Sequence, residues 1–110
     1  MQIPLFKLQT EWLPPENFPY LSKYIDIAID LETKDPNLKS KGSGSVIGEG
    51  EIVGIALATK SWSGYYPIAH EGGGNLEKQK VLDWVKEVCS NSATKIFHNA
   101  MYDVCWLRAY

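Results

Sequence analysis

Asp30 and Glu32, two carboxylates at the end of an alternating stretch, are the first candidates for chemistry. They lie two positions apart in YIDIAIDLE, residues 24–32. Side chains two apart on a β-strand point to the same side, so an extended backbone would bring these acids together. Adjacent carboxylates raise the cost of ionising each other, and Mg²⁺ or Mn²⁺, which prefer oxygen ligands, would neutralise them. The pattern indicates a candidate metal site, although the same acids could be solvated or could pair with Lys34 and Lys39.

The strand that would carry this pair is expected at Tyr24–Glu32, because apolar and other residues alternate strictly along it. One face holds Ile25, Ile27, Ile29 and Leu31, and the other holds Asp26, Ala28, Asp30 and Glu32. Residues 33–50 are rich in Gly, Ser and Lys, which predicts a long, mobile loop. A loop that begins directly after the two acids could cover their site.

Further strands are expected at Glu51–Thr59, Gly64–Ala69 and Thr94–His98. The first two follow closely in the sequence, which favours an antiparallel meander with the strand that carries the acids. A helix is expected at Asn75–Asn91, with Asn75 as its N-cap, because apolar residues recur there at helical spacing. A strand that follows a connecting helix favours parallel pairing with the first strand.

A third carboxylate, Asp103, is expected to join the pair. A second helix is predicted to begin at Asn99, and Asp103 lies four residues later, on the same face. This helix follows directly after a strand expected beside Tyr24–Glu32, so its first turns should face Asp30 and Glu32. Alternatively, Asp103 is an early-helix acid that the helix dipole stabilises.

The bulk composition is that of one soluble domain and excludes some functions. The chain has 110 residues and a net charge of −2, which argues against a protein that holds nucleic acid mainly through a basic surface. No apolar run approaches membrane-spanning length, and residues 1–23 do not resemble a signal peptide but predict an extended, proline-rich lead-in. Cys89 and Cys105 lack metal-type spacing, which favours a reducing intracellular compartment.

Two motifs resemble a known enzyme family. The sequences IDLET at 29–33 and HNAMYDVCWL at 98–107 resemble the first two motifs of the DEDD 3′–5′ exonucleases. Between them, VGIALAT at 53–59 and GYYPIAHEGGGN at 64–75 are similar to the proofreading domain of family A DNA polymerases, particularly those of phages. The resemblance extends over residues 24–107 and implies a ribonuclease H-like α/β fold. We therefore expect a truncated mixed sheet of about four strands and two helices, with residues 24–110 as the N-terminal part of the exonuclease domain.

The resemblance also implies a mechanism with two Mg²⁺ or Mn²⁺ ions that straddle the scissile phosphodiester. Asp30 would bridge both ions, Glu32 would bind the first and help orient the attacking water, and Asp103 would hold the second directly or through water. Thr33 and Asn99 would contact the terminal nucleotide, and further candidates include Leu38, which could stack against its base.

The implied substrate is the 3′ end of single-stranded or frayed DNA, from which nucleoside monophosphates are released. A polymerase domain on the same parent chain is an expected partner, no membrane is expected, and the implied location is the cytoplasm of a bacterial cell or of a phage-infected host. The family's third motif, with its fourth carboxylate, is not present in these residues, because no Asp follows Tyr110. One metal ligand would be missing, so the isolated chain is expected to be weak or inactive.

Two alternatives stay open from the sequence. One is an exoribonuclease similar to RNase D, and the other is a folded fragment without catalytic activity. His70 and His98 are expected to have hydrogen-bonded structural roles. Core positions are expected for the aromatic residues Tyr65, Tyr66, Trp84, Trp106 and Tyr110.

Overall fold

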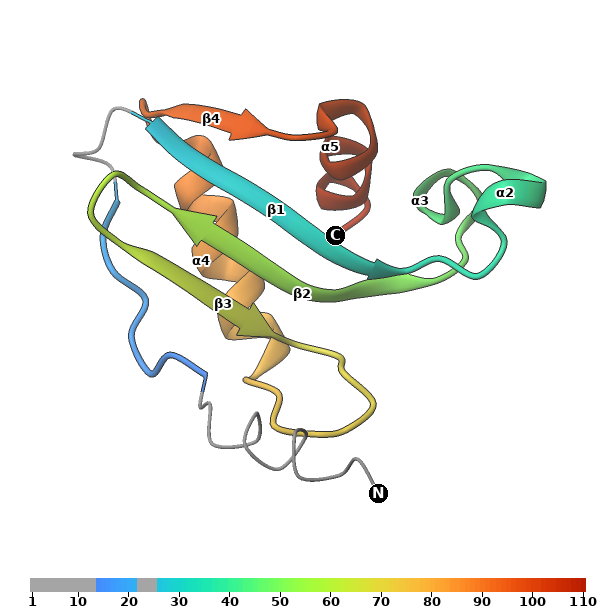
Figure 1. Cartoon of the computed structure of the whole chain (residues 1–110), viewed down its shortest axis with the longest axis horizontal. Helices are drawn as coiled ribbons and strands as arrows, with labels where there is room; N and C mark the ends of the chain where they lie inside the picture. Colours follow the sequence, from blue (N-terminus) through green and yellow to red (C-terminus); the bar gives the residue numbers. More distant parts are fainter. Residues whose placement is uncertain (1–13, 22–25) are drawn as a thin grey trace, which may run out of the picture.

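The computed structural model describes residues 14–21 and 26–110 (Figure 1). Its strands are β1 (Asp26–Lys34), β2 (Glu51–Ala58), β3 (Ser63–Pro67) and β4 (Thr94–Phe97). Its helices are α2 (Leu38–Lys41), α3 (Gly44–Ile47), α4 (Lys78–Ser90) and α5 (Ala100–Arg108). Among these described residues, no helix combines the length and apolar character that a membrane span requires.

The four strands form one mixed sheet in the order β3-β2-β1-β4. β1 pairs antiparallel with β2 and parallel with β4, and β2 pairs antiparallel with β3. The expected α/β fold class is confirmed, and the sheet is compatible with a fragment of a ribonuclease H-like fold. Because β1 is central, the acids near its end have neighbours on both sides.

The two faces of the sheet differ in what covers them. Helix α4 packs on one face (Figure 1) and buries Val81, Trp84, Val85 and Val88 against the isoleucines of β1 and β2. The segment 14–21 joins this side: Trp84 Nε1 donates to the carbonyl of Pro19 at 2.9 Å, and Tyr66 Oη donates to that of Asn17 at 2.7 Å. Residues 14–21 of the expected lead-in thus contact the domain on this side, and residues 1–13, 22 and 23 lie outside the description.

The start of α4 differs from the sequence expectation. The helix begins at Lys78, and its N-cap is Glu77, whose carboxylate accepts the backbone N–H of Lys80 at 2.8 Å. Asn75 is instead paired with the backbone of His70, through contacts of 2.8 and 2.9 Å. The prediction of an Asn75 cap was wrong because two nearby groups competed for capping, and a carboxylate at the helix N-terminus also gains from the helix dipole.

The segment after the acids is also more ordered than expected. β1 continues to Lys34, past Glu32, while residues 24 and 25 of the predicted strand lie outside the described part. The predicted loop contains the short helices α2 and α3, and Ser43 caps α3. Asp35 anchors this turn because both of its carboxylate oxygens lie 3.1 Å from the backbone nitrogen of Gly44.

Candidate active site

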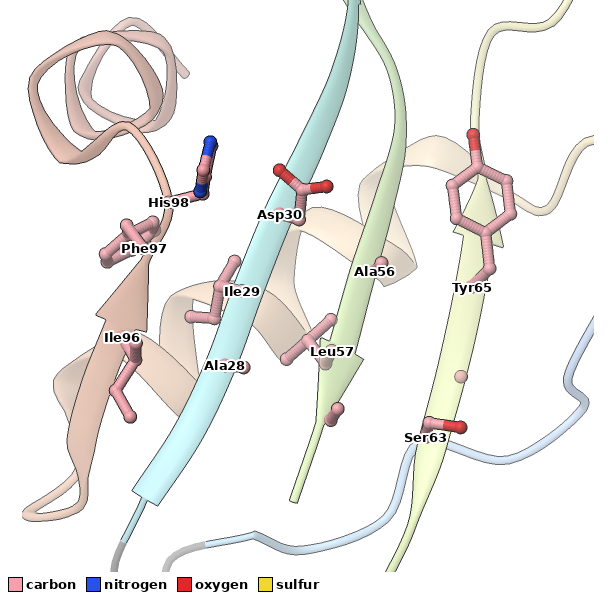
Figure 2. Close-up of a pocket in the computed structure, with 12 residues that line it drawn as sticks. Ala28, Ile29, Asp30, Ala56, Leu57, Ser63, Tyr65, Ile96, Phe97 and His98 are labelled. Atoms are coloured by element: carbon pink, nitrogen blue, oxygen red, sulfur yellow. The ribbon is translucent and has the colours of Figure 1, made fainter. Parts of the chain in front are cut away.

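The face of the sheet opposite α4, which no other described element covers, carries a groove that includes Asp30. Figure 2 shows Asp30 on β1 between His98, which follows β4, and Tyr65 on β3. Between these side chains the surface is formed by small residues, namely Ala28, Ala56, Ala58 and Gly64. Small side chains at these positions leave Asp30 accessible, and its residue is exposed to solvent.

Asp103 approaches the same end of β1 from α5. Two residues separate this helix from the end of β4, and Asp103 in its first turn is only 3% exposed. Burial raises the pKa of the Asp103 carboxyl group, and the negative charge of Asp30 raises it further, whereas a hydrogen bond from the backbone of Leu31 and the charge of His98 act in the opposite direction. The carboxyl groups of Asp103 and Asp30 therefore lie within electrostatic reach of each other.

One oxygen of Asp103 lacks a hydrogen-bond partner. Oδ2 is buried and, within the described part of the chain, no donor reaches it. Burying a carboxylate oxygen without a partner is costly, so such a group calls for an explanation, such as strain, a catalytic role, or a bound water or ion. A cation held between Asp103 and Asp30 would satisfy this oxygen and relieve the repulsion, so these residues fit a divalent metal ion.

Glu32 is held by a different contact. Tyr65 Oη donates to Glu32 Oε2 at 3.1 Å and lies 2.5 Å from His70 Nε2. Burial, the negative charge of Glu32 and this hydrogen bond raise the pKa of Tyr65, so the hydroxyl group keeps its proton. The bond links Glu32 on β1 to Tyr65 on β3, across the intervening strand β2.

The three acids do not gather into one cluster in this structure. Across residues 14–21 and 26–110, no group of three or more His, Cys, Asp or Glu side chains is arranged to hold a metal ion. Asp30 and Asp103 approach each other, while Glu32 is held by Tyr65. Carboxylates that lie close together repel one another, so gathering all three without a cation would be unfavourable. Their role as metal ligands stays a prediction.

The residues expected to contact a nucleotide lie near the end of β1 or beyond it. Thr33 Oγ1 is 2.8 Å from Tyr102 Oη, which donates its proton to Asp35 Oδ2 at 2.8 Å, so Thr33 is the donor to Tyr102. Asn99 is the exposed N-cap of α5, and its side chain makes no capping hydrogen bond. Leu38 lies on α2 and is 43% exposed. Their contact with a nucleotide stays a prediction.

Sequence reasoning did not assign Tyr65, Tyr102 or Asp35 to this region. Tyr65 contacts Glu32, and Tyr102 links Thr33 to Asp35. The alternation of β3 could have placed Tyr65 on the face of the acids. No comparable local signal joins Tyr102 to Asp35, because 67 positions separate them in the sequence.

No family model matches this chain. Over 91 residues it is 37% identical to a protein named DNA-directed DNA polymerase from Pseudomonas phage M6. The aligned region covers 78% of this chain and 14% of the phage protein, so the chain spans a small part of the length of this relative. This chain is thus similar to one segment of a much longer phage protein that is named as a DNA polymerase.

Proposed function

We propose that this chain is the N-terminal part of a 3′–5′ exonuclease domain of a DNA polymerase. It would remove nucleotides from the 3′ end of single-stranded or frayed DNA and release nucleoside monophosphates. The observation that carries this proposal is the buried carboxylate of Asp103, with an unpartnered oxygen, beside Asp30 at the end of β1. The name of the phage relative supports DNA, rather than RNA, as the substrate.

Three carboxylates of this chain would hold the metal ions in the proposed function: Asp30, Glu32 and Asp103. Mg²⁺ or Mn²⁺ bound there would activate the attacking water and stabilise charge on the leaving 3′-oxygen. Without a cation, the acids would repel the phosphate backbone of a nucleic acid. Binding of the 3′ end should therefore depend strongly on a divalent ion.

The residues of the proposed site would have different roles. Burial and the backbone of Leu31 fix the carboxylate of Asp103, while Asp30 is exposed to a substrate. Thr33 and Asn99 would contact the terminal nucleotide. Such pre-arranged charges act without reorganisation during the reaction, which makes them effective in catalysis.

The direct test follows degradation of a 3′-labelled single-stranded DNA in Mg²⁺ or Mn²⁺. Because the isolated chain lacks the fourth carboxylate of the family it resembles, its rate should be lower than that of a complete proofreading exonuclease by about 10²–10³-fold or more, the usual cost of one well-placed electrostatic group. Asp30→Asn should remove any activity that remains, whereas Asp26→Asn, on the same face at the other end of β1, should not.

Three outcomes would count against the proposal. Degradation that continues in EDTA or in Asp30→Asn would show that the carboxylates do not act through a metal ion. Full activity of the isolated chain would show that another residue, or a second copy of the chain, completes the site. A clear preference for a 3′-labelled RNA would favour the exoribonuclease alternative.

A further inference from the structure

The hydroxyl group of Tyr65 reaches across one strand to contact Glu32. In the sheet, Glu32 of β1 lies opposite Gly54 of β2, and Tyr65 of β3 lies opposite Ala56, its neighbour by two positions. Tyr65 therefore spans β2 diagonally, and its Oη lies 3.1 Å from Glu32 Oε2. Diagonal neighbours on one face of a sheet are within reach of an aromatic side chain.

Gly54 makes this crossing possible. A Cβ atom built on Gly54 would collide with the hydroxyl oxygen and the ring carbons of Tyr65. The backbone of Gly54 does not have a positive φ, so the glycine is required for space and not for its conformational freedom. The sheet also shifts register between Glu32 and Thr33, directly beside this contact, and such irregularities re-aim nearby side chains.

His70 supports the hydroxyl group from the other side. Tyr65 has one proton, which it donates to Glu32, so His70 Nε2, at 2.5 Å, must donate to the tyrosine oxygen. The histidine is fixed in turn, because the side chain of Asn75 accepts from its backbone N–H and donates to its carbonyl. A directed series of hydrogen bonds thus runs from His70 through Tyr65 to Glu32.

We propose that Tyr65 is a positioning residue for Glu32, an inference that rests on the proposed metal-dependent function. Its hydroxyl group occupies Glu32 Oε2 and fixes the side chain, which leaves Oε1 available to a divalent cation. Hydrogen bonds to the far side of a metal-ligating carboxylate orient it, and their loss typically weakens metal binding by about 10–100-fold. Gly54 and His70 maintain this arrangement.

The neighbouring tyrosine provides a matched control. Tyr66 is fully buried on the covered side, and its hydroxyl group donates to the carbonyl of Asn17. Tyr65→Phe and Tyr66→Phe each remove one hydroxyl group from adjacent positions of β3, but only Tyr65 contacts a candidate metal ligand. A purely structural hydroxyl group would affect unfolding without affecting metal affinity.

The experiment measures Mn²⁺ affinity by electron paramagnetic resonance or titration calorimetry, and unfolding in urea. Tyr65→Phe should bind Mn²⁺ about 10–100-fold more weakly than the parent chain, while Tyr66→Phe should keep the affinity of the parent. Gly54→Ala should follow Tyr65→Phe because it displaces the ring. In a Glu32→Gln background, Tyr65→Phe should have no further effect on Mn²⁺ affinity, since the group that it positions has changed.

The outcomes separate this inference from the proposed function. If the parent binds Mn²⁺ no better than Asp30→Ala, the metal site itself fails, and the role of Tyr65 fails with it. If the parent binds Mn²⁺, Asp30→Ala does not, and Tyr65→Phe equals the parent, only the positioning role is overturned. Tighter binding by Tyr65→Phe would also overturn it, because Tyr65 would then hold Glu32 away from the ion.

Discussion

The two faces of the sheet arise from one alternating pattern but have opposite characters. On the covered face, Ile27 and Ile29 of β1 are buried beneath α4, with 0% and 2% exposure. On the open face, the intervening residues Asp26, Ala28 and Asp30 are exposed. Alternation thus stabilises the domain through one face and leaves the other accessible.

The difference extends to the neighbouring strands. Opposite Ile29 and Leu31 of β1, β2 presents Leu57 and Ile55, whereas opposite Ala28 and Asp30 it presents alanines. Large side chains on the open face would fill the groove and bury the acids, which would raise the cost of ionising them. The small residues therefore contribute little to stability and preserve access to the site.

The largest effect expected from this contrast is on stability. Ile27→Ala on the covered face should lower the free energy of unfolding by about 2–5 kcal/mol, because it leaves a cavity in a packed core. Ile96, its counterpart on the open face of β4, is 50% exposed, and Ile96→Ala should cost less than about 1 kcal/mol. Urea unfolding of both variants and the parent measures the difference.

The two isoleucines offer the same substitution in adjacent strands, so side-chain chemistry is controlled. Comparable losses in both variants would contradict the contrast and mean that the open face is covered in solution. In that case the unfolding midpoint should depend on protein concentration, as expected when a second copy of the chain covers the face.

A second effect is on metal affinity. Asp30→Ala should abolish Mn²⁺ binding that the parent shows. Without metal, the same variant should be more stable than the parent, since it removes the charge that acts on Asp103. Titration calorimetry with Mn²⁺ and urea unfolding in EDTA provide the two measurements.

Asp26→Ala is the control, because it removes an exposed acid from the same face of the same strand. It should keep the Mn²⁺ affinity of the parent. Equal Mn²⁺ binding by the parent and Asp30→Ala would exclude Asp30 from any metal site and weaken the functional proposal.

The features that sequence predicted correctly are those set by local periodicity and chain order. The alternation of apolar and polar residues identified β1 and its two faces. The order of strand, helix and strand correctly predicted that β4 pairs parallel with β1. The same order brought Asp103 within electrostatic reach of Asp30, because only two residues separate α5 from β4.

The features that sequence missed depend on the register of the strands and on competition between alternative hydrogen-bond partners. The contact of Tyr65 with Glu32 requires a specific alignment of three strands and the absence of a side chain at Gly54. The helices α2 and α3 depend on local capping and on Asp35, which binds the backbone nine residues away. Asn75 could either cap α4 or pair with the backbone of His70, and the sequence pattern alone does not show which contact forms.

The smallest expected effect concerns Asp103, the one carboxylate that the fold buries. Its pKa in the folded chain is raised above the ordinary value of 3.8, mainly by burial. The protonated form is therefore favoured by folding, so this contribution to stability is complete below about pH 4 and is lost as the pH rises through the raised pKa. In EDTA, Asp103→Asn should remove this loss, and it should be more stable than the parent at pH 7 but not at pH 3.5.

Mn²⁺ should reverse this order of stability, so that the parent becomes more stable than Asp103→Asn. Such a reversal distinguishes a buried metal ligand from a buried acid that only lowers stability. Mn²⁺ that binds only the folded chain stabilises it in proportion to the logarithm of its concentration, and Asp103→Asn should lose most of that gain. Asp83→Asn, which neutralises an exposed acid on α4, should gain stability with Mn²⁺ as the parent does. If Asp103→Asn were the more stable chain at pH 7 both in EDTA and in saturating Mn²⁺, the burial of Asp103 would have no connection with metal. Urea unfolding of the three chains at pH 3.5 and 7, with Mn²⁺ added at pH 7, makes the comparison, because only a ligand is destabilising without the ion and stabilising with it.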